Sequence, residues 1–238
     1  METMTTSIIL PFLVFFPFLG AVISYIIGRS NKGARDIWCW ILSAVIFIAS
    51  LMLIGKETVY SLRGFCGLGL SFVADGFGVI LAVLTGAIWL ITTIFSKEYM
   101  AAERNRNRYY FFVFLTLGAT MGIFLSADLF TTFIFFEIMS FTSFVLVMHD
   151  EEDFTVRSAK TYLAVAVIGG LVTLMGLFMM YQKAGTLNMT ELTAFMQSRE
   201  NPAEFYAIGV LILFGFAAKA GLFPLHIWLP NAYTVAPA

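Results

Sequence analysis

Charged residues are scarce in this sequence. Only 12% of its 238 residues are Asp, Glu, Lys or Arg, whereas 60% are hydrophobic, and the mean hydropathy is +0.88. Soluble proteins carry about 25% charged residues, and a soluble core of this size has no room for so large an apolar fraction. The composition therefore excludes a soluble enzyme and indicates a membrane protein.

An excess of basic residues is also lacking. The formal net charge is −1 and the pI is about 6.1, which argues against nucleic acid as a partner because polyanion binding requires clustered positive charge. The two cysteines, Cys39 and Cys66, flank one apolar stretch, so we expect no disulfide between them. The N-terminus has neither the basic segment nor the small-residue cleavage site of a signal peptide.

Motifs for cofactors and metals are missing as well. The sequence contains no G-x-G-x-x-G, no G-x-x-x-x-G-K-[ST], no Cys-x-x-Cys and no His-rich tract. We therefore expect no cofactor, no metal and no autonomous active site. Any redox chemistry would belong to partner subunits, as in an oxidoreductase or hydrogenase complex.

Long uncharged stretches predict where the chain crosses a membrane, since a central charge costs about 3 kcal/mol and a crossing needs about 20 residues. The sequence predicts an all-α polytopic membrane protein with about seven transmembrane helices. The predicted spans are 3–28, 37–55, 76–96, 109–127, 129–149, 161–182 and 205–238. The fifth is interrupted only by Glu137 and the seventh only by Lys219.

The distribution of basic residues predicts the orientation. Nine lie on one side of the predicted spans and four on the other. The nine are Arg29, Lys32, Arg35, Lys97, Arg104, Arg106, Arg108, Arg157 and Lys160, and the four are Lys56, Arg63, Lys183 and Arg199. The positive-inside rule then places the N-terminus outside the inner (cytoplasmic) membrane.

A short helix is predicted between the last two spans. Asn188 has the sequence context of an N-cap with Glu191 three residues later. Leu192, Phe195 and Met196 share one face, so we expect this helix to lie along the outer membrane interface.

Glu137 lies near the middle of its predicted span, and ionisable groups at that depth usually face protein and serve a function. On its own helix only Ser140 is placed to hydrogen-bond it, so we expect its partner on another span. The alternative is a protonated glutamic acid that joins two helices.

Lys219 lies deep in the last span, and no carboxylate follows it in the sequence. Desolvation disfavours a charged lysine and a nearby carboxylate favours it, so a lysine paired with Glu137 can titrate in the working range and pass on a proton. The alternative is that its amine reaches to the inner interface.

Pro224, five residues later, predicts a kink or break in this helix because it lacks a backbone donor. Broken membrane helices are tolerated against protein or a wet cavity, where transporters hold their ions. His226 follows the break and is either a structural hydrogen-bonding group or a further proton relay.

The segment GFAAKAGLFPLHIWLPNA, residues 215–232, carries a K-A-x-x-F-P-L-H-x-W-L-P-x-A pattern. It resembles the signature of the proton-translocating antiporter family, which comprises the antiporter-like subunits of complex I, the large subunits of Mrp-type sodium/proton antiporters and membrane subunits of energy-converting hydrogenases. FFEIMS at 135–140 and Asp75-Gly76 resemble the family too. Residues 219–225 are closest to the Mrp and hydrogenase types. Asn231 stands where many members have aspartate.

The resemblance implies that Glu137 tunes the proton affinity of Lys219, that Lys219 carries the proton, and that His226 lines the path beyond it. It divides the chain into an N-terminal three-helix segment, 1–108, and an incomplete first antiporter repeat, 109–238. The resemblance covers only the first half of a member, so either the polypeptide is truncated or a separately encoded chain supplies the later helices. We favour the second alternative and expect a subunit that works within a multisubunit complex. The transported ions would be protons, alone or with sodium.

Two other functions remain open at this stage. A retinal-binding seven-helix pump or sensor also has a lysine in its last helix, although here Gly215 replaces the expected counterion one turn before Lys219 and Pro224 follows. A purely structural membrane subunit could retain the motif without transport.

Overall fold

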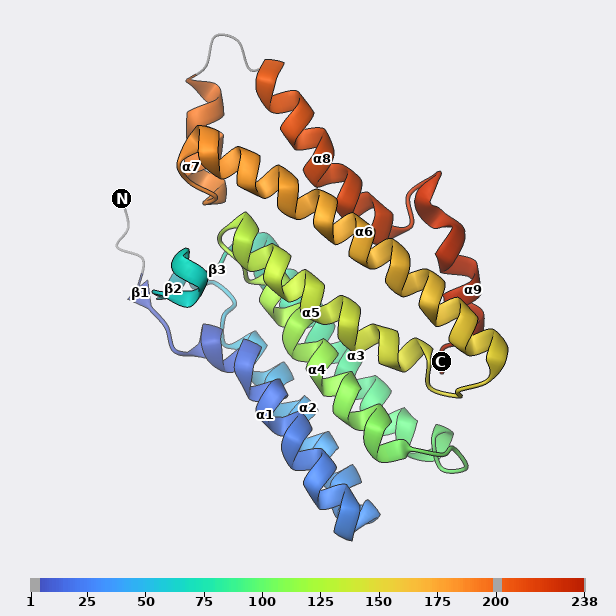
Figure 1. Cartoon of the computed structure of the whole chain (residues 1–238). Helices are drawn as coiled ribbons and strands as arrows, with labels where there is room; N and C mark the ends of the chain where they lie inside the picture. Colours follow the sequence, from blue (N-terminus) through green and yellow to red (C-terminus); the bar gives the residue numbers. More distant parts are fainter. Residues whose placement is uncertain (1–4, 199–202, 238) are drawn as a thin grey trace. The chain divides into compact units, whose positions relative to one another are not determined.

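The computed structural model is predominantly helical and describes residues 5–198 and 203–237 (Figure 1). The elements of its first part are β1 (Thr5–Thr6), α1 (Ile9–Ser30), α2 (Lys32–Leu51), β2 (Thr58–Leu62), η1 (Phe65–Gly67), β3 (Leu70–Ala74), α3 (Gly76–Tyr99) and α4 (Arg106–Phe124). Those of its second part are α5 (Leu129–Val147), α6 (Asp153–Ala184), α7 (Met189–Gln197), α8 (Ala203–Ala220), η2 (Leu225–Ile227) and α9 (Trp228–Val235).

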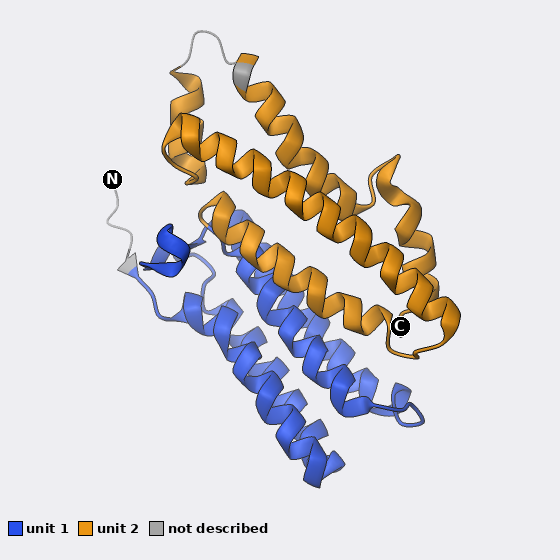
Figure 2. Ribbon diagram, in the orientation of Figure 1, with its two compact units in different colours: residues 1–126 blue, residues 127–238 orange. Residues whose placement is uncertain are grey.

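The chain divides into two compact units, Met1–Ser126 and Ala127–Ala238, which Figure 2 distinguishes by colour. The sequence placed a boundary after residue 108, whereas the compact units part after Ser126 because α4 packs along α1 within unit 1. The division at 108 concerned an internal repeat, and it stays a prediction.

Unit 1 contains four long helices and a small sheet. Asn31 separates α1 from α2 in an extended conformation, and its side chain caps α2 by accepting from the amide of Ala34 at 3.0 Å. Asp75 caps α3 in the same way, with the amide of Gly78 at 2.6 Å. The strands β2 and β3, which connect α2 to α3, pair antiparallel with each other. β2 also pairs in parallel with β1, which precedes α1. Cys39 is buried and Cys66 exposed, and both are free thiols.

Unit 2 is built around α6, which runs alongside α8 and α9 and also contacts α5 (Figure 1). Asp128 caps α5, accepting from the amide of Thr131 at 2.7 Å. Gly185, in the left-handed conformation with φ of 74°, ends α6. These caps fix where the helices of unit 2 begin and end.

The short helix predicted after Asn188 is α7. Asn188 accepts hydrogen bonds from the amides of Thr190 and Glu191, at 3.0 and 3.2 Å. Leu192 is buried in an apolar cluster of α5, α6 and α8 residues, and Phe195 and Met196 pack against the same cluster. The apolar face of α7 therefore packs against α5, α6 and α8 of unit 2.

Within the described residues, six helical segments are long and apolar enough to cross a membrane: Ile9–Ser30, Lys32–Leu51, Gly76–Tyr99, Leu129–Val147, Asp153–Ala184 and Phe205–Val235. They correspond to six of the predicted spans. Predicted span four is α4, which is helical as expected but begins with Arg106 and Arg108 and is less apolar. The total of about seven helices therefore agrees with the sequence, with α4 as the most polar of them. Arg199, and the predicted span ends at residues 3 and 238, lie outside the described residues.

Candidate functional site

Lys219 and Glu137 form an ion pair inside unit 2. Lys219 lies in the last turn of α8, and its Nζ donates to Oε1 of Glu137 on α5 at 2.8 Å. The same amine donates to the backbone carbonyl of Phe136 at 3.1 Å and lies 4.2 Å from the centroid of the Phe136 ring. The expected partner of Glu137 on another helix is thus Lys219, and Ser140 bonds the carbonyl of Phe136 instead.

The pair is shielded from solvent. The side chain of Lys219 is 5% exposed and that of Glu137 is 21% exposed. Burying two charges costs several kcal/mol each unless the attraction between them and further hydrogen bonds compensate. The Phe136 carbonyl and the Phe136 ring supply part of that compensation on the lysine side. Removing one partner would leave the other charge buried and unpaired.

Glycines on α6 and α8 allow the three helices to approach. A Cβ on Gly170 would lie 2.5 Å from Oε1 of Glu137, so a larger residue there would have to displace the carboxylate from its present position. A Cβ on Gly215 would overlap Thr173 and the carbonyl oxygen of Gly169. Gly170 thus allows α6 to approach α5, and Gly215 allows α8, the helix that carries Lys219, to approach α6.

The helix that carries Lys219 is interrupted directly after it. α8 ends at Ala220, Gly221 has a positive φ of 70°, and Pro224 lies in the segment before η2 and α9. An interrupted helix leaves carbonyl groups that need donors. The amide of Leu222 bonds the carbonyl of Ala217 at 2.9 Å, and Nε1 of Trp228 donates to the carbonyl of Ala218, also at 2.9 Å. The indole therefore ties α9 back to the end of α8.

His226 lies in η2, beyond this interruption. Its ring is half-buried, with its centroid 5.6 Å from that of the Phe223 ring. Its Nδ1 is buried and has no hydrogen-bond partner within the described ranges. Among those residues the structure gives no hydrogen bond or ion pair between His226 and Lys219. The structure thus brings Glu137 and Lys219 together and leaves His226 apart from them.

Sequence reasoning missed a group of hydroxyls that extends from the ion pair. Ser140 donates to the carbonyl of Phe136 at 2.7 Å, the same oxygen that accepts from Lys219. The Tyr162 hydroxyl on α6 lies 2.7 Å from Oγ of Ser143 and donates to the carbonyl of Ser140 at 3.3 Å. The Tyr162 ring contacts the Trp228 ring, with centroids 4.8 Å apart. The spacing of Ser140 and Ser143, which places both on one face of α5, was the available signal.

Comparison with known proteins places these residues in a family. Residues 126–238, nearly the whole of unit 2, match the family model described as "NADH:quinone oxidoreductase/Mrp antiporter, TM". This match includes Glu137, Lys219, Pro224 and His226. The chain belongs to the family of proton-antiporter-like membrane subunits.

Curated relatives include further members of this antiporter-like family. The chain is 30% identical over 242 residues to an Na(+)/H(+) antiporter subunit of Bacillus subtilis (strain 168), an alignment covering 99% of this chain and 48% of that protein. It is 32% identical over 170 residues to an Na(+)/H(+) antiporter subunit of Alkalihalophilus pseudofirmus (strain ATCC BAA-2126 / JCM 17055 / OF4), with 71% and 34% covered. The chain therefore spans less than half the length of these relatives.

Two solved structures share the fold of this antiporter-like subunit. A chain of the membrane-bound sulfane sulfur reductase, an archaeal respiratory membrane complex, superposes with a TM-score of 0.86 at 23% identity, covering 97% of this chain and 48% of that chain. A chain of the Mrp complex from Dietzia sp. DQ12-45-1b superposes with a TM-score of 0.80 at 24% identity, with 95% and 43% covered. The helical arrangement is thus that of antiporter-like membrane subunits.

Proposed function

We propose that this chain translocates protons as a membrane subunit of a multisubunit antiporter or redox-driven ion pump, and that Lys219 and Glu137 relay the proton. The observation that carries the proposal is the buried ion pair at the point where α8 is interrupted. Intramembrane ionisable groups of this kind are usually functional, and broken helices accompany ion sites in transporters.

The proposed relay depends on a change in the hydrogen-bond partner of the Lys219 amine. While Nζ of Lys219 donates to Glu137 and to the carbonyl of Phe136, the ammonium form is stabilised. When the carboxylate turns away or takes up a proton, the buried site disfavours the ammonium, and Nζ releases its proton to the next acceptor. Reprotonation of Nζ and return of the Glu137 carboxylate restore the ion pair.

His226 is the acceptor that we propose beyond the break. Its Nδ1 has no hydrogen-bond partner in the described part of the chain, and an imidazole can accept and donate near neutral pH. Because His226 and Lys219 are not in direct contact, a water or a movement at residues 221–224 would complete the transfer. Gly221, with its positive φ, provides a site for such movement.

The proposed setting is the cytoplasmic membrane, with the N-terminus outside. The names of the relatives support protons as the transported ion, alone or in exchange for sodium. The same relatives support assembly with other membrane subunits. Family membership favours this function over a retinal-binding protein, and transport measurements distinguish it from a purely structural subunit.

The test uses the assembled complex in everted membrane vesicles. Proton movement is followed with a pH-sensitive dye for the wild-type complex and for complexes with Lys219→Ala or Glu137→Gln. Lys160→Gln, at an exposed position on α6, is the control for loss of one charge. We expect both site variants to assemble and to lose proton movement, while the control retains it. Wild-type transport in both site variants would refute the relay and support the structural alternative.

A further inference from the structure

A cavity of about 860 Å³ lies in unit 1, where α1, α2 and α4 meet the segment that precedes α4. All its lining residues belong to unit 1, far in sequence from Lys219 and Glu137. They are Tyr25, Lys32, Arg35, Glu103, Arg104, Asn105, Arg106, Asn107, Arg108, Phe111 and Phe112. The lining holds five cationic side chains and one carboxylate, so the cavity is strongly positive.

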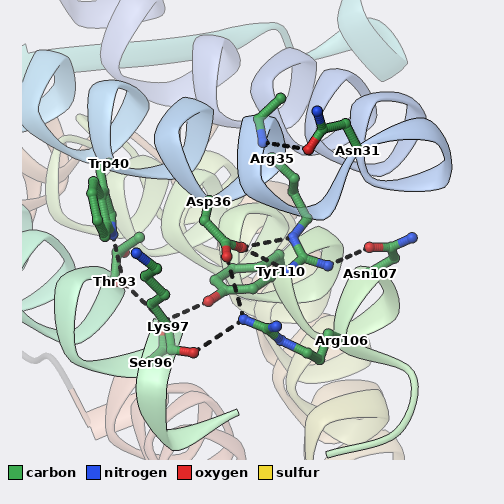
Figure 3. Close-up of polar contacts among 11 residues, drawn as sticks. Asn31, Arg35, Asp36, Trp40, Thr93, Ser96, Lys97, Arg106, Asn107 and Tyr110 are labelled. Atoms are coloured by element: carbon green, nitrogen blue, oxygen red, sulfur yellow. Dashed lines mark hydrogen bonds and ion pairs between the residues drawn. The ribbon is translucent and has the colours of Figure 1, made fainter. Parts of the chain in front are cut away.

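Three of the lining residues, Arg35, Arg106 and Asn107, belong to a network of polar contacts that Figure 3 shows. Arg35 is fully buried, and its guanidinium contacts the Asp36 carboxylate at 2.6 Å and the side-chain oxygen of Asn107. Arg106 shares the same carboxylate, with its Nη2 at 3.4 Å. One carboxylate thus serves two guanidinium groups, and a positive charge remains uncompensated. The ring of Tyr110, 4.7 Å from the Arg35 guanidinium carbon, holds that side chain in place.

The start of α4 leaves donors available for an anion. Arg106, the first residue of this helix, lines the cavity, and its Nη2 donates to the carbonyl of Lys97 at 3.1 Å as well as to Asp36. α4 begins at this residue without a side-chain cap, because Asn105 adopts a left-handed conformation with φ of 57°. Uncapped helix starts present backbone N–H groups and a partial positive charge, which favours phosphate. The cavity therefore combines the positive charge of Arg106 with the backbone N–H groups of an uncapped helix start.

An apolar surface adjoins this positive cavity. Tyr25 and Phe111 line the cavity and contact each other, with ring centroids 5.8 Å apart. Along α1, the exposed side chains Leu19, Val22 and Ile26 follow one face away from the cavity, at 63%, 47% and 61% exposure. Such a face in a membrane helix is covered by acyl chains. A ligand with an anionic head and apolar tails fits both parts.

We propose that this cavity binds the phosphate of an anionic phospholipid headgroup. In this arrangement Lys32 and Arg104, both exposed, form the rim of the cavity. The start of α4 provides the inner N–H donors beside the charge of Arg106, and the acyl chains lie along α1. Basic pockets at the cytoplasmic ends of membrane helices are suited to such headgroups. The acyl chains favour a lipid over free phosphate, because free phosphate would leave the adjoining apolar face unused.

The test measures lipid retention by native mass spectrometry. The complex is purified in mild detergent with equal amounts of phosphatidylglycerol and phosphatidylcholine. The variant Lys32→Gln/Arg104→Gln removes two exposed rim charges without touching the buried network. Arg157→Gln/Lys160→Gln, also on a basic segment, is the matched control. We expect selective retention of phosphatidylglycerol by the wild type and the control, and about 30-fold weaker retention by the rim variant.

Four results would overturn the proposal. Equal retention of phosphatidylcholine would remove the role of the charge, and undiminished retention by the rim variant would place the lipid elsewhere. Displacement of phosphatidylglycerol by millimolar inorganic phosphate would identify a soluble anion as the ligand. Loss of the lipid whenever the other subunits are bound would assign the cavity to an acidic partner segment. None of these readouts depends on proton transport by Lys219.

Discussion

Lys219 and Glu137 are 82 positions apart in the sequence, yet Nζ of one lies 2.8 Å from Oε1 of the other. The contact depends on α6, whose Gly170 leaves space for the carboxylate, and on the end of α8, where the helix is interrupted after Ala220. Tight packing therefore holds a pair of buried charges next to irregular backbone. The ion pair and the helix packing around it can each be altered by single substitutions.

The ion pair between Lys219 and Glu137 should contribute to the free energy of unfolding, because each charge stabilises the other. Glu137→Gln leaves Lys219 without its carboxylate and Lys219→Met leaves Glu137 without its ammonium, and we expect each to lose about 3 kcal/mol in the free energy of unfolding. Glu137→Gln/Lys219→Met, which removes both charges while keeping similar volumes, should restore most of it. Thermal unfolding in detergent completes the double-mutant cycle. Purely additive losses would mean that the two side chains do not interact.

Gly170 should be required for the position of the Glu137 carboxylate. A methyl group there would approach Oε1 to 2.5 Å, so Gly170→Ala must displace the carboxylate or separate α5 from α6. We expect impaired proton movement and a stability loss of about 1–3 kcal/mol, as for other overpacked sites. Gly209→Ala on α8 is the control, because a Cβ at that position meets nothing within 4 Å. Equal behaviour of the two variants would contradict the steric role of Gly170.

Trp228 should hold the interrupted helix together. Trp228→Phe keeps the aromatic contact with Tyr162 but leaves the carbonyl of Ala218 without its indole donor. The carbonyl would retain the amide of Gly221, at 3.4 Å, as a donor. Loss of the shorter hydrogen bond costs about 1 kcal/mol, and we expect faster protease cleavage within 221–227. Tyr233→Phe, at a position 74% exposed, is the control. Unchanged cleavage in Trp228→Phe would show that the indole bond does not restrain the break.

The hydroxyl of Tyr162 should assist proton movement. It bonds Ser143 and the carbonyl of Ser140, and Ser140 in turn donates to the carbonyl that accepts from Lys219. A hydrogen bond worth about 1 kcal/mol corresponds to a roughly fivefold slower rate in Tyr162→Phe. Initial rates in vesicles measure this, with Tyr206→Phe, 66% exposed, as the control. Identical rates would remove Tyr162 from the path.

Much of this arrangement could be predicted from local sequence. Uncharged stretches located the long helices, and Asn188 predicted α7 because N-caps depend on one residue and its neighbours. Glu137 and Lys219 were identified as a pair because no other charge interrupts their spans. The family was identified from the segment around Lys219 and from the one around Glu137.

Other features depend on contacts that one sequence does not reveal. α4 could not be assigned to unit 1 in advance, because its packing on α1 is a tertiary contact. The packing of α7 against the other helices of unit 2 is also a tertiary contact. It could not be predicted because an amphipathic face can pack on protein as well as on a membrane interface. The roles of Gly170, Tyr162 and Trp228 likewise follow from side chains that meet across helices.

The most direct test of the relay is proton transport by the complex carrying Lys219→Arg. Arginine keeps the positive charge and can pair with Glu137, but it does not release its proton in proteins. The account predicts normal assembly with loss of proton movement, whereas Lys160→Arg transports like the wild type. Wild-type transport by Lys219→Arg would contradict the account, because the side chain at position 219 would then act without giving up a proton.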